Sequence, residues 1–196
     1  TLTTGAMQFV VQEAALTIPY EVGTPGTTPT ALLTYGLAAT HLDDNSAPQD
    51  EQRYMTISSL MQVTIVDASK SLFNAVSEIS TQYRKGTMGV FGGFKWQMDQ
   101  NIFTRTTGPQ GGTPLVNGAS QTGATLVTDG WTAAAALRLR RGDMITVADV
   151  NHVNPASYMS TGRLQHFLVT TDGSSDAGGA LTVNISPSMV LAGSGQ

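Results

Sequence analysis

The three histidines, His41, His152 and His166, are the first side chains that could bind a metal or act as a general base. A helical zinc site places two histidines one turn apart, and no pair in this chain has that spacing. His41 precedes Asp43 and Asp44 at the expected end of a helix, where the dipole alone favours a histidine. His152 is expected in a loop and His166 in a strand. The sequence therefore predicts no metal site and no cofactor.

The paired acids, Asp43–Asp44 and Asp50–Glu51, are the candidates for acid–base catalysis. They are expected at a helix end and in a polar loop, which favours solvated carboxylates. The chain lacks a Gly-x-Ser-x-Gly elbow, a phosphate-binding loop with its lysine and a dinucleotide fingerprint. It has no cysteine, which excludes disulfides and thiol catalysis. No catalytic residue is predicted, and a hydrolase with a triad built from distant residues ranks third among the hypotheses.

Two short motifs have both a functional and a purely structural interpretation. Arg141-Gly142-Asp143 is the adhesion tripeptide, but glycine and aspartate at these positions also suit a turn between strands. Asn184-Ile185-Ser186 fits the glycosylation pattern, but it lies in an alternating segment and precedes Pro187. A turn and a strand are the favoured interpretations.

Composition limits the partners of the chain. The net charge is −4 and the scattered 10 lysines and arginines form no basic stripe, which argues against a dedicated nucleic-acid binder. Charged residues make up 12% of the chain, against about 25% in typical soluble domains. Low charge suits large protein–protein contacts. No apolar run approaches the ~20 residues that span a bilayer, so no membrane partner is expected.

The two halves of the chain have different patterns. The first half has helical periodicity and a short extended segment. Helices are predicted over residues 6–18, 29–42 and 67–85, and a strand over 54–58. Gly86 is expected in the left-handed position that ends the third helix. Together with Gly92 and Gly93 it is expected to form a hinge before the next strand.

The second half alternates at period two, which is typical of strands with one buried face. Strands are predicted at 94–98 and near 124–128, 136–140, 144–148, 163–170 and 181–186. Turns are predicted at Asp129-Gly130 and Arg141-Gly142-Asp143. The Gly-, Pro- and Thr-rich residues 108–123 are predicted to be a linker or long loop. Short strands at this spacing predict a small barrel or sandwich.

Several segments, in order, resemble the major capsid (coat) proteins of tailed phages. They are Gln82–Asn101, the helix 29–42 with its Asn45-Ser46-Ala47-Pro48 exit, and Arg140-Arg141-Gly142-Asp143-Met144-Ile145-Thr146-Val147. The similarity extends over roughly residues 6–190 and is greatest to the short-tailed Salmonella-type branch, whose subunit carries an inserted β-barrel.

The resemblance implies an α+β fold. Residues 1–105 would belong to the axial and peripheral parts of the capsid fold, and residues 106–196 would form the inserted antiparallel β-barrel. Family members continue beyond both ends of this chain, so a fragment of a longer subunit is expected. The implied function is self-assembly, without enzymatic activity, into hexamers and pentamers of an icosahedral shell. Scaffolding and portal proteins are the implied partners, around enclosed double-stranded DNA that is not bound specifically. The implied location is the virion, after assembly in the host cytoplasm.

Charged residues are rare in this chain, and those near the expected strand ends, together with one large aromatic residue, are expected to form contacts between subunits. The candidates are Asp129, Gly130, Trp131, Arg138, Arg140 and Arg141. A buried Trp131 with solvated arginines is an equally weighted alternative. The second-ranked function is a β-rich phage tail, baseplate or carbohydrate-binding module.

Overall fold

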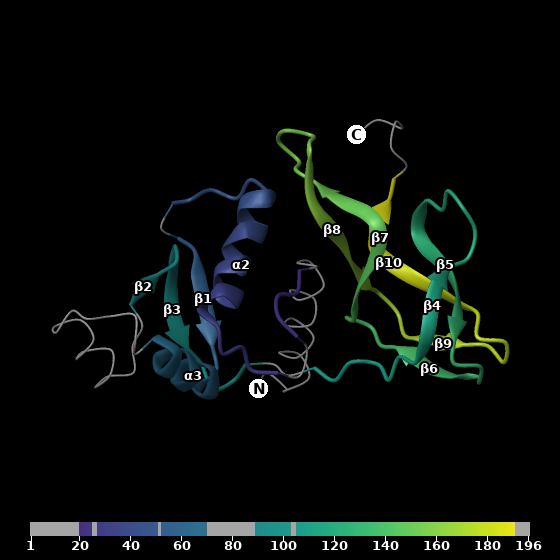
Figure 1. Cartoon of the computed structure of the whole chain (residues 1–196), viewed down its shortest axis with the longest axis horizontal. Coiled ribbons are helices and arrows are strands. Elements are labelled where there is room, and N and C mark those ends of the chain that lie inside the picture. Colours follow the sequence, from purple (N-terminus) through teal and green to yellow (C-terminus); the bar gives the residue numbers. More distant parts are fainter. Residues whose placement is uncertain (1–19, 25–26, 51, 70–88, 103–104, 191–196) are drawn as a thin grey trace, which may run out of the picture. The chain divides into compact units, whose positions relative to one another are not determined.

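The computed structural model describes residues 20–24, 27–50, 52–69, 89–102 and 105–190 (Figure 1). The chain mixes helix and strand and divides into two compact units. One unit, the helical unit, comprises Val22–Thr104 with Asn154–Ser157. The other, the barrel unit, comprises Thr1–Glu21, Arg105–Val153 and Tyr158–Gln196.

The helical unit combines two helices with a small sheet. Its elements are α2 (Leu32–Asp44), β1 (Tyr54–Ile57), α3 (Ser59–Ser69), β2 (Val90–Phe91) and β3 (Phe94–Met98). The strand order is β1-β3-β2, with β1 parallel and β2 antiparallel to β3. Tyr35, Ile57 and Ile65 form the core, and the Tyr35 and Trp96 rings meet edge to face at 5.5 Å. The predicted strands 54–58 and 94–98 are confirmed.

Two helix starts differ from the sequence-based prediction. Helix α2 begins at Leu32, three residues after the predicted start at residue 29. Helix α3 begins at Ser59, so the predicted start near Asp67 is wrong. The Ser58 hydroxyl accepts a hydrogen bond from the Met61 amide at 3.3 Å, which caps the earlier start. Predicted helix 6–18, the remainder of 67–85 and the cap at Gly86 lie outside the described residues.

Gly92 and Gly93 form the two-residue loop between β2 and β3. Their φ angles are +60° and +81°, the left-handed values that a tight hairpin of the type I′ class requires at both positions. The glycine-rich segment therefore turns the chain directly into β3. Whether it also acts as a hinge stays a prediction.

The barrel unit is an antiparallel, nearly closed, barrel-like sheet. Its strands are β4 (Gly112–Val116), β5 (Gly123–Trp131), β6 (Ala136–Leu139), β7 (Met144–Val153), β8 (Ser160–Val169), β9 (Gly173–Ser175) and β10 (Leu181–Met189). Five of them follow the order β4-β5-β10-β8-β7, and β6 pairs with β9. All strands predicted in this half are present.

The interior of the barrel unit is apolar. The buried cluster consists of Leu126, Trp131, Leu139, Phe167, Val169, Leu181, Val183 and Ile185. In β10, Leu181, Val183 and Ile185 point inward while Thr182 and Asn184 are exposed, which gives the predicted period of two. The glycosylation-like motif at residues 184–186 lies within this strand, as predicted.

Three other predictions for this half are wrong. Residues 108–123 are not only a linker, because they contain β4, which pairs with β5. Asp129-Gly130 is not a turn but lies inside β5, opposite a bulge in β4. His152 lies in β7, not in a loop, and is buried. In each case pairing with the next or preceding strand in the chain decided the conformation, β4 with β5 and β7 with β8.

Candidate assembly surface

Trp131 lies inside the barrel unit, with 8% of its surface exposed. Its indole Nε1 donates to the Thr128 hydroxyl at 2.7 Å, and that hydroxyl donates to the Leu181 carbonyl at 2.7 Å. The Trp131 amide donates to the Gly179 carbonyl at 3.1 Å. Both polar groups of the residue are therefore satisfied internally. The sequence left open whether Trp131 lies at a subunit contact or in the core of the barrel unit, and the structure shows it in the core.

Arg138 is also buried, with 9% exposed, so it is not one of the solvated arginines. Its Nε donates to the Ser175 hydroxyl at 2.9 Å, Nη1 to the Gln110 carbonyl at 3.3 Å and Nη2 to the Thr132 carbonyl at 2.8 Å. The Ser175 hydroxyl donates in turn to the Ala134 carbonyl at 2.7 Å. The planar guanidinium thus ties together three segments that are separate in sequence. This is an internal structural role.

The turn at Arg141-Gly142-Asp143 is confirmed, and Asp143 is its anchor. The Asp143 carboxylate is 2% exposed and accepts from the amides of Gly108 at 3.0 Å and Arg140 at 2.8 Å. Its other oxygen forms an ion pair with Arg105 at 3.2 Å. Because this carboxylate is buried and engaged, it is not accessible to an adhesion receptor. Asp143 was predicted to accept a hydrogen bond within its own turn, and the bond from the Arg140 amide confirms this. Its bond from the Gly108 amide could not be predicted from the residues of the turn.

Asp129, Gly130, Arg140 and Arg141 are exposed. Within the described part of the chain, the Asp129 carboxylate accepts one local hydrogen bond, from the Gly130 amide at 2.7 Å. The backbone amide of Arg141 donates to Asp172 at 2.7 Å, and that of Arg140 to Asp143. These bonds fix the backbone while the two guanidinium groups remain at the surface. Three charged candidates are therefore available for contacts: Asp129, Arg140 and Arg141.

Gly130 lies in β5 opposite a bulge in β4, because Gly112 pairs with Trp131 and Leu115 with Asp129, so that two β4 residues face Gly130 alone. Its φ is +79°, and a Cβ at this position would lie 2.6 Å from the Thr113 carbonyl oxygen. Both facts require glycine. Gly130 is thus needed for the strand pairing itself.

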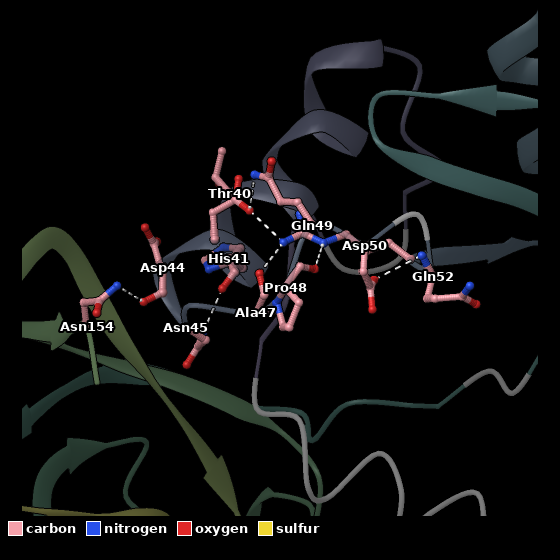
Figure 2. Close-up of polar contacts among 12 residues, drawn as sticks. Thr40, His41, Asp44, Asn45, Ala47, Pro48, Gln49, Asp50, Gln52 and Asn154 are labelled. Atoms are coloured by element: carbon pink, nitrogen blue, oxygen red, sulfur yellow. Dashed lines mark hydrogen bonds and ion pairs between the residues drawn. The ribbon is translucent and has the colours of Figure 1, made fainter. Parts of the chain in front are cut away.

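The end of helix α2 leads into a loop through Ala47, Pro48 and Gln49 (Figure 2), and the Arg53 side chain holds this loop. Arg53 Nη2 donates to the Ala47 carbonyl at 2.7 Å, and Nε donates to the Pro48 carbonyl at 3.1 Å. The same guanidinium pairs with Asp43 at 2.8 Å, and the Gln49 amide donates to that carboxylate at 3.1 Å. The hydrogen bonds from Gln49 and Arg53 lower the pKa of Asp43. The polar segment between α2 and β1 is therefore held in one conformation by side-chain hydrogen bonds and an ion pair.

Helices α2 and α3 are apolar on more than one face. Tyr35 and Ile65 are buried in the core. The other faces expose four aliphatic side chains: Leu33 (74%), Leu37 (41%), Leu60 (65%) and Val63 (67%). Leu33 and Leu37 lie one turn apart on α2, and Leu60 and Val63 one turn apart on α3, so the exposed side chains neighbour each other in pairs. Neighbouring exposed apolar side chains favour contact with another surface.

His152 and His166 come together in the barrel unit, against Tyr20. The Tyr20 ring centroid lies 5.9 Å from that of His152 and 5.8 Å from that of His166. The Glu21 amide donates to His166 Nδ1 at 3.3 Å. Burial lowers the pKa of His166, and this outweighs the opposing effect of the Glu21 carboxylate. No group of three or more metal-ligating side chains is found among the described residues.

No protein-family model and no curated protein matches this chain. None of the helices built from the described residues is long and apolar enough to cross a lipid bilayer. The surfaces described above comprise three exposed charges on the barrel unit and exposed aliphatic side chains on the two helices of the other unit.

Proposed function

We propose that this chain is part of the major capsid protein of a tailed phage. Its copies assemble into hexamers and pentamers of an icosahedral shell around double-stranded DNA, with scaffolding and portal proteins as partners. The protein acts through contacts between subunits, without catalysis or a cofactor. Its place is the virion, after assembly in the host cytoplasm.

The observation that carries the proposal is the order of the resembling segments and the elements in which they lie. The exit segment at residues 45–48 follows α2 and leads to β1, and the Gly93-Phe94-Lys95-Trp96 segment enters β3. The Arg140–Val147 segment supplies the turn before β7 and the start of that strand. An α+β part followed by a barrel-like sheet is the arrangement that the resemblance implies.

The exposed apolar side chains of α2 and α3 also support a role in assembly. A subunit that remained alone would keep Leu33, Leu60 and Val63 in water, each at least 65% exposed. Burying a large aliphatic side chain stabilises a contact by about 1.5–3 kcal/mol. A shell surrounds each subunit with neighbours and so offers a place for such surfaces.

Electron microscopy of the full-length protein, expressed alone or with the product of the neighbouring upstream gene, tests the proposal. Closed particles of uniform diameter are expected. A protein that stays monomeric or trimeric at high concentration, as measured by sedimentation velocity, would contradict the proposal. That result would favour the alternative, a β-rich tail, baseplate or carbohydrate-binding module.

The exposed charges give a residue-level test. Replacing Asp129, Arg140 and Arg141 together by alanine should leave the melting temperature unchanged, because among the described residues their side chains make no long-range hydrogen bond or ion pair. Charges at interface rims set register and rate of association. Fewer closed particles or aberrant shells are therefore expected. Normal particle yield would remove these residues from the interface.

A further inference from the structure

The barrel unit contains a cavity of about 530 Å³. Strands β4, β5, β7 and β10 supply its lining, which consists of Pro114, Leu115, Val116, Leu126, Thr128, Trp131, Ile145, Thr146, Val147, Ala148 and Val183. The size falls within the range of about 300–1,000 Å³ that is typical of small-molecule sites.

The cavity lies at the seam where the barrel is not closed. Strands β4 and β7 are the two ends of the five-stranded order. Each contributes consecutive residues to the lining, 114–116 and 145–148. One face of a strand supplies only alternate residues, so a consecutive run shows that the cavity opens along the strand edges.

The backbone keeps this seam open. In β4, Pro114 has no amide hydrogen to donate. In β7, the pairing with β8 shifts between Thr146 and Asn151, and Asp149 within that bulge has a φ of +63°. Proline and bulges are the devices that prevent edge strands from pairing. They disfavour both direct closure of β4 onto β7 and the addition of an extended peptide strand between them.

The lining is uncharged. Among its polar groups, the Trp131 indole and the Thr128 hydroxyl already bond to each other and to the Leu181 carbonyl. An ionised ligand would lose part of its hydration there without gaining an oppositely charged partner. We propose that this seam cavity binds the aryl or alkyl body of an uncharged small molecule. This site is additional to the proposed role in assembly and does not depend on it.

Trp131 provides a reporter inside the cavity. The chain has two tryptophans, so Trp96→Phe leaves Trp131 as the single one. The probe is 4-bromobenzyl alcohol, whose bromine quenches indole fluorescence on contact, and 4-bromobenzoate is its charged counterpart. Saturable quenching of Trp131 by the alcohol is expected, at a half-saturating concentration at least about tenfold lower than for the benzoate.

Matched alanine-to-phenylalanine variants locate the site. Ala148 is exposed at the cavity mouth, and Ala124 is exposed on the same sheet outside the lining. Ala148→Phe should weaken binding of the alcohol at least about tenfold by filling the mouth, whereas Ala124→Phe should not change it. If Ala148→Phe does not fold, Thr146→Phe serves the same purpose.

Three results would overturn the assignment. The first is quenching that rises linearly with probe and equally for both compounds. The second is saturable quenching that Ala148→Phe or Thr146→Phe leaves unchanged. The third is quenching by the alcohol that disappears as the protein self-associates in sedimentation runs, because the cavity would then hold part of a second copy.

Discussion

The Asp143 carboxylate offers the sharpest test of how the barrel unit is held together. Asp143→Ala removes the acceptor for two backbone amides and the anion 3.2 Å from Arg105. Each hydrogen bond to a charged group contributes about 1.5–3 kcal/mol, and losing the pair with Arg105, whose side chain is 29% exposed, costs less than the ~3–5 kcal/mol of a fully buried pair. Because these losses overlap, we expect the free energy of unfolding to fall by about 3–5 kcal/mol.

That loss is a large part of the roughly 5–15 kcal/mol that stabilises a typical domain. At about 4–8 °C per kcal/mol for a domain of 60–100 residues, the melting temperature should drop by roughly 12–40 °C. Asp143→Asn keeps one acceptor oxygen and should lose about half as much. Asp129→Ala is the matched control, since its exposed carboxylate bonds only to the next amide.

Urea denaturation followed by Trp131 fluorescence, in a Trp96→Phe background, measures these differences within the barrel unit. The Asp143 variants should lower the midpoint with an unchanged slope. If Asp143→Ala loses no more stability than Asp129→Ala, the carboxylate is not an anchor. The turn would then be held by its backbone bonds alone.

Three further changes separate internal from surface roles. Gly130→Ala should destabilise the barrel unit by about 2–4 kcal/mol in urea titrations, because the new Cβ clashes with the Thr113 carbonyl and a left-handed φ costs roughly 1 kcal/mol in addition. Gly123 also has a left-handed φ, of +89°, but open space around it, so Gly123→Ala should show only the cost of the φ angle. Arg138→Met should cost at least about 2 kcal/mol by thermal melting, because it leaves buried acceptors unpaired, whereas exposed Arg141→Met should change stability by less than about 0.5 kcal/mol. Since burial lowers the folded pKa of His166 below its ordinary value of about 6.5, its contribution to stability is complete above that pH and is lost as the pH falls through the folded pKa. In urea titrations, the His166→Gln variant should therefore lose less unfolding free energy than the unsubstituted protein when the pH is lowered from about 7.5 to about 5. Equal losses in the two proteins would show that His166 does not have a lowered pKa in the folded state.

The sequence predicted strands well where one face of the strand is buried. In β10 the alternation of Leu181, Val183 and Ile185 with polar residues defines both the element and its inward face. Strand β4 was missed because Gly112, Thr113 and Pro114 carry no apolar period. It forms because β5 supplies the hydrogen-bonding partner, which local sequence cannot reveal.

The same limit explains the error at Asp129-Gly130. A glycine with positive φ suits both a hairpin turn and a bulge, and the dipeptide does not distinguish them. In the folded unit the dipeptide lies within β5 and pairs with β4, and the bulge that faces Gly130 is in β4. For the candidate site, local pattern found the turn that ends at Asp143 but could not show that Arg138 spans three segments, since those segments meet only in the folded unit.

The buried positions of Trp131 and Arg138 change how assembly can be tested. Truncating either residue removes bonds or packing inside the barrel unit, so a loss of particles in those variants would report unfolding. Asp129, Arg140 and Arg141 have exposed side chains, and Leu33 and Val63 lie on the outer faces of the two helices. Only substitutions of this second kind can separate assembly from folding, because they leave the internal bonds in place. A loss of shells with an unchanged melting temperature would therefore assign these surfaces to contacts between subunits.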